Sequence, residues 1–436
     1  MSLEPAPDGG WMAWLQVVGA HLVNFNTWGF INSFGFFQSY YVTALGESES
    51  TVSWIGSIQI FLLFFIGTIS GRSMDAGYFR ATIAIGCFLQ VFGAFMTSLS
   101  TKYWQVFLAQ GVCMGLGDGM LFAPAVALIS TYFTTKRAVA VAAIVSGSAS
   151  GGMVFPVIAR QLLPQLGFGW TVRVMAFVML FNAAFALAVL RQRTPPRKAG
   201  PWIEWDAFRE PLWLLVTAAS FFCIGAIYVP YFFLTPFSHD QIHVSSANSL
   251  TILLVLNAVG IPGRLIPGYL ADRYFGKLMT IAPLGIAAAI VLYCWAGVST
   301  LPGLIPYVCI YGSLGAGTQG LMPSTIASLT TDPRKMGVRL GMALSFMGIA
   351  ALVSQPIAGA LIKANNGNYL YAQMFAGSLM MVGSLFYFAA ALFQRKMDKK
   401  SQRMSIEQEV EEQRADEIGD ESKEKTRPNS PAQSNQ

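Results

Sequence analysis

The chain has 436 residues, of which 54% are hydrophobic and only 11% are charged. A soluble domain carries roughly 25% charged residues, so a water-exposed globular surface is excluded. The charge is also unevenly placed, because 9 of the 28 basic and 10 of the 22 acidic residues lie beyond position 394. The sequence therefore predicts a membrane-embedded body at 1–394 and a charged tail of a different kind at 395–436.

Twelve apolar segments, separated by charged residues or by Pro and Gly, make up the body. A helix of about 20 residues crosses a hydrocarbon core of roughly 30 Å, and every segment reaches that length. Helices are expected because open strands would leave backbone groups without hydrogen bonds in lipid. The fold class predicted is an all-α polytopic membrane protein. Its spans are expected at 11–41, 52–71, 79–98, 104–132, 137–163, 170–190, 209–237, 247–270, 277–298, 303–330, 337–363 and 370–393.

The distribution of Lys and Arg predicts the orientation of the chain. If both termini are cytoplasmic, inner loops and adjacent helix ends hold 14 basic residues and the outer ones hold four. Inner loops of membrane proteins are enriched in Lys and Arg, which favours this arrangement. We therefore expect a multi-pass protein of the plasma membrane with both ends in the cytoplasm. The pI near 9.0 follows from this topology and requires no nucleic acid partner.

Three landmarks recur at offsets of 197 to 200 residues. The matched positions are Gly71 and Gly268, Asp75 and Asp272, Pro124 and Pro323, Thr131 and Thr330, and Pro156 and Pro356. They predict two six-helix halves of the same topology, at 1–190 and 209–394, joined by a basic, Pro-rich linker at 191–208. The tail at 395–436 has too few apolar residues to fold and is expected to be disordered. Parallel halves are typical of secondary transporters with a substrate site between them.

Three stretches resemble a known family. The segment 268–273 (GYLADR) is similar to the loop motif of the major facilitator superfamily between helices 2 and 3, which recurs between helices 8 and 9. The stretches 7–14 (PDGGWMAW) and 132–140 (YFTTKRAVA) resemble the entries to helices 1 and 5 of its monocarboxylate porter family, fungal branch. The resemblance covers the body and implies twelve helices and alternating access. It carries almost no information about the substrate.

Two positions depart from the lactate-type members of that family. Those members carry a Lys in helix 1 and, in helix 8, an Asp four residues before an Arg. Here the corresponding residues are Asn32 and Gly260, while Arg264 is kept. These departures argue against proton–monocarboxylate symport by that family's mechanism.

Two charged residues are predicted inside the membrane. Asp118 lies near the middle of the 104–132 span, where a carboxylate costs roughly 2.5–3.5 kcal/mol on insertion scales. It is a candidate proton carrier or partner of a cationic group, and a structural ion pair or interhelical hydrogen bond is the alternative. Arg264 is a candidate carboxylate clamp, since a guanidinium binds carboxylates through two hydrogen bonds. It could instead pair with Asp118 or Asp272.

Weaker candidates share the faces of their helices. His21, Asn24, Trp28 and Asn32 are spaced by 3, 4 and 4 residues, which places them on one helix face. This stripe lines a cavity or forms helix–helix hydrogen bonds. Further candidate substrate or coupling residues follow in the seventh and tenth spans, near prolines that can free backbone groups. They are Tyr228, Tyr231, Thr318 and Gln319.

The repeated loops carry candidate gating charges. The resemblance implies that they form contacts between the halves in the outward-open state, and ordinary loop charge is the alternative. The residues are Asp75, Arg80, Asp272 and Arg273.

We expect a secondary transporter that moves a small organic molecule, an organic acid or a fungal metabolite, by alternating access. Efflux of a secondary metabolite from a biosynthetic cluster is one alternative, and a non-transporting nutrient sensor is another. No catalytic constellation, metal site or nucleotide motif is predicted, so an enzyme is not expected. No cofactor is expected, although proton coupling is possible. The expected partners are the small-molecule substrate and the lipid bilayer, with no nucleic acid and with protein partners unknown.

Overall fold

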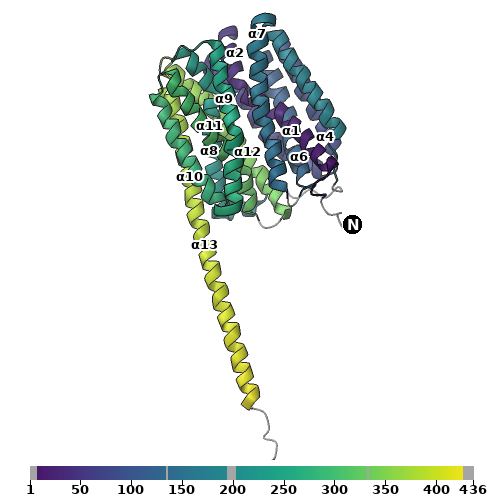
Figure 1. Cartoon of the computed structure of the whole chain (residues 1–436), viewed down its shortest axis with the longest axis vertical. Helices are drawn as coiled ribbons and strands as arrows, with labels where there is room; N and C mark the ends of the chain where they lie inside the picture. The colour runs from purple at the N-terminus through teal and green to yellow at the C-terminus, as the bar shows by residue number, and fades with distance from the viewer. Residues whose placement is uncertain (1–6, 134–135, 194–202, 331–332, 426–436) are drawn as a thin grey trace, which may run out of the picture.

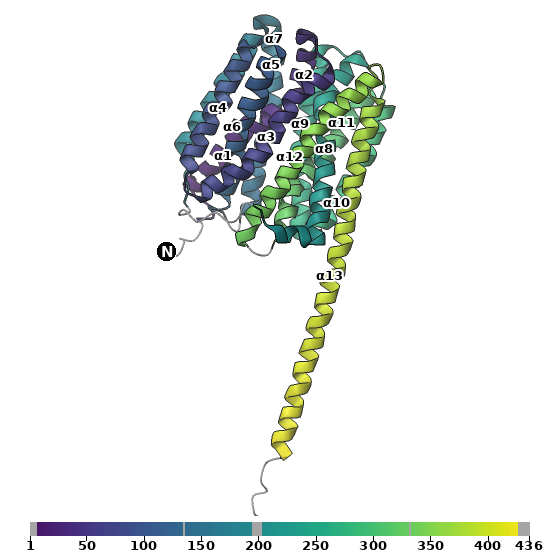
Figure 2. The same ribbon diagram turned by 180° about the vertical axis from the view of Figure 1, so that it is seen from behind.

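The computed structural model describes residues 7–133, 136–193, 203–330 and 333–425, and it is helical with no strand in those ranges. Figures 1 and 2 show an upright bundle from which one long helix projects. The first half contains α1 (Trp11–Asn32), α2 (Phe34–Leu45), α3 (Glu49–Asp75), α4 (Phe79–Leu99), α5 (Tyr103–Val106), η1 (Phe107–Met114), α6 (Gly115–Ile129) and α7 (Arg137–Val189). The second contains η2 (Trp205–Arg209), α8 (Pro211–Asp240), α9 (Ser246–Leu270), η3 (Ala271–Phe275), α10 (Lys277–Cys294), η4 (Trp295–Gly297), α11 (Leu301–Ser328), α12 (Pro333–Ala364) and α13 (Leu370–Lys425).

These elements make the twelve predicted crossings. α1 and α2 form one crossing, interrupted at Ser33, and α5, η1 and α6 form another that contains a π-helical stretch. Within the described residues, nine helices are long and apolar enough to span a membrane when α7 is counted once. α1 and α11 fall outside that set because polar residues and glycines lower their hydropathy. The prediction of an all-α, multi-pass membrane fold is confirmed.

α7 supplies two crossings, because Gly167 turns the chain with a φ of 72° that favours glycine. Before the turn, α7 runs parallel to α1, with Gly151 packed against Gly29. After the turn it runs antiparallel to α1, so that the Gln16 side chain donates to the Val189 carbonyl at 3.0 Å. The predicted spans at 137–163 and 170–190 are therefore the two arms of one hairpin.

The two halves lie side by side, and their main contact is between α3 and α12 (Figure 2). At one end of this contact the Ser50 hydroxyl donates to the Pro356 carbonyl at 2.8 Å. At the other end the Thr68 hydroxyl donates to the Gly341 carbonyl at 3.0 Å. We call the end of the bundle with the N-terminal residues and the projecting part of α13 the tail face, and the opposite end the loop face (Figure 1). On the loop-face side, α2 also packs against α8.

The tail differs from the prediction of disorder, because α13 continues as one helix to Lys425. The physical reason lies in its composition. Glu, Lys, Gln and Arg, which dominate 395–425, are good helix formers, and a helix that extends an existing one needs no new nucleus. The tail therefore needs no hydrophobic core to be helical, which the argument from apolar content overlooked.

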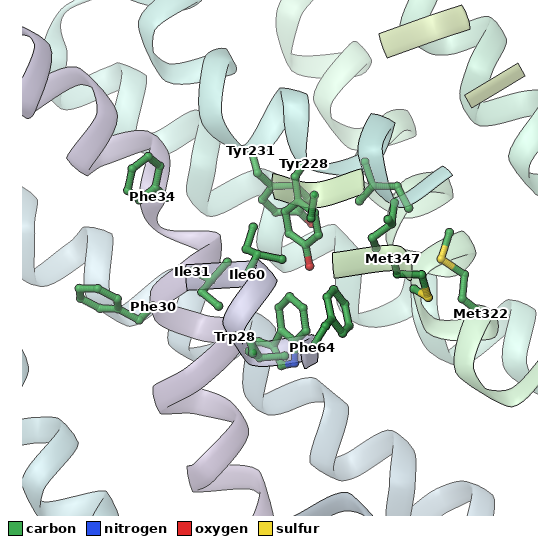
Figure 3. Packing of buried hydrophobic residues seen from close by; sticks show 14 of the residues in the cluster. Trp28, Phe30, Ile31, Phe34, Ile60, Phe64, Tyr228, Tyr231, Met322 and Met347 are labelled. Carbon is green, nitrogen blue, oxygen red and sulfur yellow. The ribbon is translucent and has the colours of Figure 1, made fainter. Parts of the chain in front are cut away.

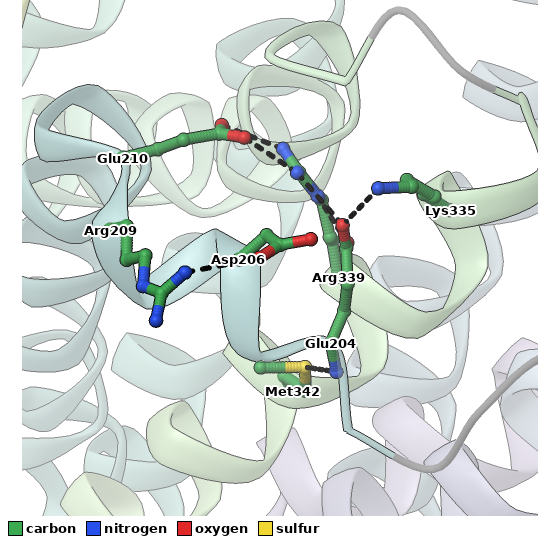
Figure 4. A network of polar contacts seen from close by, with 7 residues as sticks. All are labelled: Glu204, Asp206, Arg209, Glu210, Lys335, Arg339 and Met342. Atoms are coloured by element: carbon green, nitrogen blue, oxygen red, sulfur yellow. Dashed lines mark hydrogen bonds and ion pairs between the residues drawn. The ribbon is translucent and has the colours of Figure 1, made fainter.

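The linker is attached to the second half by buried charges (Figure 4). Arg339 of α12 is 5% exposed and binds Glu204 at 2.5 Å and Glu210 at 2.6 and 2.7 Å. Lys335 adds a contact of 2.7 Å to Glu204. The hydrogen bond from Arg339 is the main reason that the pKa of Glu204 falls to about 2. The predicted linker at 191–208 therefore ends in a fixed segment, while its residues 194–202 lie outside the described ranges.

Candidate substrate-binding site

An aromatic stack joins the two halves halfway along their helices. Trp28 of α1 and Tyr228 of α8 have ring centroids 5.9 Å apart and an interplanar angle of 11°, and both are buried. Phe64 and Phe122 pack on the same indole with centroids 5.4 and 5.5 Å away. Figure 3 shows Trp28, Phe64 and Tyr228 close to one another. Both halves therefore contribute to one buried aromatic cluster at this depth.

A chain of hydrogen bonds leads from this stack to Arg264. The Arg264 guanidinium donates through Nη2 to Gln319 Oε1 at 2.9 Å and through Nη1 to the Gly260 carbonyl at 3.3 Å. The Gln319 amide in turn donates through Nε2 to the Tyr228 hydroxyl. Three helices of the second half, α8, α9 and α11, thus position a cation beside an aromatic ring.

Within the described ranges, the positive charge of Arg264 has no acidic partner. Among the described residues it forms no ion pair with Asp or Glu, and its side chain is partly exposed. The hydrogen bonds to Gln319 and Gly260 use two of the five N–H groups of a guanidinium. A Cβ at position 260 would lie 3.0 Å from Nη1, so glycine leaves room for the guanidinium beside the backbone. The remaining donors are suited to a carboxylate or another planar anion.

Asp118 is placed away from Arg264, in the interior of the first half. Its carboxylate is fully buried and accepts hydrogen bonds from Gln59 Nε2 of α3 at 2.8 Å and from Gln90 Nε2 of α4 at 2.5 Å. The flanking Gly117 and Gly119 allow α4 and α3 to approach closely. The structure therefore does not join the two intramembrane charges, and it gives Asp118 interhelical hydrogen bonds instead.

The four residues of the polar stripe on α1 have different packing partners. His21 Nδ1 lies 2.8 Å from the Ala143 carbonyl, and Asn32 donates to the Ser148 carbonyl at 3.5 Å, both on α7. Asn24 packs against Gly147 of the same helix. These three residues therefore lie at a helix–helix contact within one half. Only Trp28 from the stripe reaches the other half.

Of the remaining predicted residues of α8 and α11, Tyr231 adjoins Arg264 and Thr318 does not. The Tyr231 ring lies 5.8 Å from that of Tyr228, and its buried hydroxyl interacts with the Arg264 guanidinium. Thr318 donates to the carbonyl of Leu314 in its own helix at 2.9 Å, which accounts for its hydroxyl. The candidate site therefore consists of Arg264, Gln319, Tyr228, Tyr231 and Trp28.

The predicted gating charges lie at the tail face. Asp75 is partly exposed and Arg80 is exposed, at the end of α3 and the start of α4. Asp272 and Arg273 are exposed in the π-helical turn η3, and no hydrogen bond or ion pair to the first half involves them in the described part of the chain. Their role as a contact of the outward-open state stays a prediction.

Several interactions were missed at the sequence level. Gln59 and Gln90, the partners of Asp118, are ordinary polar residues of apolar spans. Glu49 and Tyr369 are 320 positions apart and meet at the loop face. Only the polarity of Gln59 and Gln90 inside predicted spans offered a signal, because a buried amide needs a partner.

Twelve crossings in two similar halves, with a cation and an aromatic stack where the halves meet, define a multi-pass membrane transporter. The chain belongs to the Major Facilitator Superfamily, whose family model matches residues 18–353. It is 43% identical to an MFS-type transporter of Gibberella zeae over 89% of both chains. It is 38% identical to the MFS-type transporter dbaD of Emericella nidulans, over 86% of this chain and 85% of the relative. It is 35% identical to the aspyridones efflux protein apdF of the same species, over 92% of this chain and 82% of the relative.

Proposed function

We propose that the protein exports a small fungal metabolite that carries a carboxylate or a similar delocalised anion. The observation that carries this proposal is Arg264, a partly exposed intramembrane cation with no acidic partner in the described structure. An unpaired charge in the membrane is costly, so its retention points to a ligand that neutralises it. The name of one relative, the aspyridones efflux protein, supports export of a metabolite.

The bound anion is expected to form two hydrogen bonds with Arg264, while a flat part of the molecule packs on Tyr228 and Trp28. Gln319 fixes the positions of the Arg264 guanidinium and the Tyr228 phenol relative to each other through its two hydrogen bonds. A conjugated acid fits both surfaces. The finer assignment to the monocarboxylate porter family is part of the proposal. The protein would share that family's arginine but not its Asp–Arg pair, since Gly260 stands at the Asp position.

The direction of transport follows from the proposed orientation. The tail face carries most of the basic residues, so we place it in the cytoplasm and the loop face outside, with the plasma membrane as the location. The α2–α8 and Ser50–Pro356 contacts close the loop face, while no extensive packing joins α6 to α11 in the described residues. We infer that the site opens toward the cytoplasm, because Arg264 and Gln319 are partly exposed. We further propose that transport requires no cofactor and no chemical conversion, and that the partners are the substrate and the lipid bilayer.

The test is an untargeted comparison of metabolites inside and outside cells that contain or lack the protein. Export predicts compounds that accumulate inside and decline outside when the protein is lost. The protein with Arg264→Gln should resemble its absence, because the amide cannot neutralise an anion. Lys102→Gln is the matched control, since Lys102 is an exposed cation in the turn before α5 of the first half.

Two results would contradict the proposal. Accumulation of the same compounds outside the cells on loss of the protein would indicate import. Full export by the Arg264→Gln variant at wild-type protein levels would remove Arg264 from the site.

A further inference from the structure

A second set of polar groups lies at the loop face, away from Arg264, where the halves meet. The Tyr369 hydroxyl lies 3.0 Å from Glu49 Oε1 of the first half and 3.0 Å from Asp240 Oδ2 of the second. Tyr369 is 1% exposed. Burial, followed by the charges of Glu49 and Asp240, raises the pKa of Tyr369, so its hydroxyl keeps its hydrogen.

One hydroxyl hydrogen cannot satisfy two carboxylates. Tyr369 can donate to one of them, and its lone pairs would then face the other at hydrogen-bond distance. That second contact is attractive only if the other carboxyl carries a hydrogen and donates it to the tyrosine oxygen. The geometry therefore calls for one proton more than the ionised groups provide.

The surroundings place this proton on Glu49. Its Oε2 atom is buried and has no hydrogen-bond partner, whereas Asp240 is about half exposed and has His239 Nδ1 at 3.0 Å from Oδ1. Neither Glu49 nor Asp240 forms an ion pair with Lys or Arg in the described residues. Glu49 lies at the N-terminus of α3, where the partial positive charges of the helix favour a carboxylate. Burial without a neighbouring cation opposes the negative charge of that carboxylate.

We propose that Glu49, Tyr369 and Asp240 form a proton-binding lock that closes the loop face. In the closed state the Glu49 carboxyl donates to Tyr369, and Tyr369 donates to Asp240. When the halves separate at this face, both hydrogen bonds break, Glu49 becomes hydrated, and its proton leaves to the adjacent water. The ligand that closes this face is then a proton, and its binding favours the conformation that opens toward the tail face.

The lock has consequences that do not depend on the substrate. If closure binds one proton, the ratio of closed to open protein changes about tenfold per pH unit. This holds in the pH range between the titration of the open state and that of the closed state. Closure should therefore increase as the pH falls. Failure of the Arg264 site would leave this expectation intact, and failure of the lock would leave the Arg264 site intact.

The experiment measures the width of the loop face in the full-length protein in nanodiscs, without substrate. Spin labels replace Ala44 and Ser299, which are exposed on opposite halves, after the five cysteines have been substituted. Electron–electron distances are recorded from about pH 4 to about pH 8, a range in which buried carboxyl groups titrate. The wild-type lock should show a short distance at low pH and a growing long-distance population as the pH rises.

Glu49→Gln should hold the short distance at every pH, because the amide can donate to Tyr369 without titrating. Tyr369→Phe should lose most of the short-distance population at low pH. Glu47→Gln is the matched control, since Glu47 is a nearby carboxyl without a hydrogen bond to Tyr369, and it should titrate like wild type.

Three results would overturn the lock. The first is a wild-type distance that does not respond to pH, and the second is an unchanged pH response in Glu49→Gln. The third is a distance that responds to sodium in place of choline at fixed pH, because a metal cation would then be the ligand. Size-exclusion profiles of each variant establish that the folded protein is being compared.

Discussion

Arg264 of α9 and Gln319 of α11 are joined by a hydrogen bond of 2.9 Å, and the same glutamine donates to Tyr228. Because Tyr228 stacks on Trp28, a cation of one half is connected through two side chains to the other half. A ligand that competes for the Arg264 donors would therefore disturb the contact between the halves. In the proposed function, this connection would couple substrate binding to conformational change.

Replacement of Gln319 should reduce affinity for anions. Gln319→Leu leaves Arg264 without its orienting partner, and a lost hydrogen bond to a charged group predicts about tenfold weaker binding. Gln319→Glu should be more severe, since the new carboxylate would neutralise the guanidinium. Ligand-induced thermal stabilisation of the purified protein measures both effects. Thr318→Val is the matched control, because Thr318 only bonds its own helix. Equal affinity in all three variants would contradict this role of Gln319.

The Trp28–Tyr228 stack should stabilise the conformation that is closed at the loop face. Aromatic pairs contribute about 0.5–1.5 kcal/mol beyond area burial, so Trp28→Leu should shift the equilibrium toward the open loop face by about two- to tenfold. Trp28→Phe should retain much of the effect. Spin-label distances across the loop face measure the shift. A population unaltered by Trp28→Leu would show that the stack does not bias this equilibrium.

Asp118 should affect stability more than coupling. Its partners Gln59 and Gln90 both lie in the first half, so the carboxylate does not cross the moving interface. Asp118→Leu leaves two buried amides without an acceptor, which costs about 1–3 kcal/mol for each group. A lower melting temperature in detergent is the expected result. Asp118→Asn should retain pH-dependent closure. If closure of this variant no longer responds to pH, Asp118 is the proton carrier after all.

The linker attachment should depend on acid pH. Because Arg339, with Lys335, lowers the pKa of Glu204 to about 2, the folded carboxylate binds its proton less readily than an unfolded one of about 4.5. The stabilisation is therefore complete above that unfolded value and disappears as the pH falls toward 2. Glu204→Gln should lower stability near neutral pH by about 1.5–3 kcal/mol. The difference from wild type should shrink on acidification, and thermal unfolding measured across this range is the check.

Residue types were sufficient to predict several parts of the protein. Low charge and twelve apolar runs predicted the helical membrane fold, because lipid permits few alternatives for the backbone. Arg264 was also found directly, since a cation inside a span is rare enough to be a candidate alone. The tail was predicted incorrectly, because low apolar content excludes a core but does not exclude a helix that extends from α13.

The partners of these residues were decided only by the tertiary structure. Asp118 and Arg264 were plausible partners on charge alone. The packing of α3, α4 and α6 instead places Asp118 within hydrogen-bond distance of Gln59 and Gln90. The meeting of Glu49 with Tyr369 and Asp240 requires that α3 begins, α8 ends and α13 begins at one face of the bundle. Hydropathy along the chain determines which segments enter the membrane. The rotation and contacts of each helix set which polar side chains meet there, and these depend on residues far apart in the sequence.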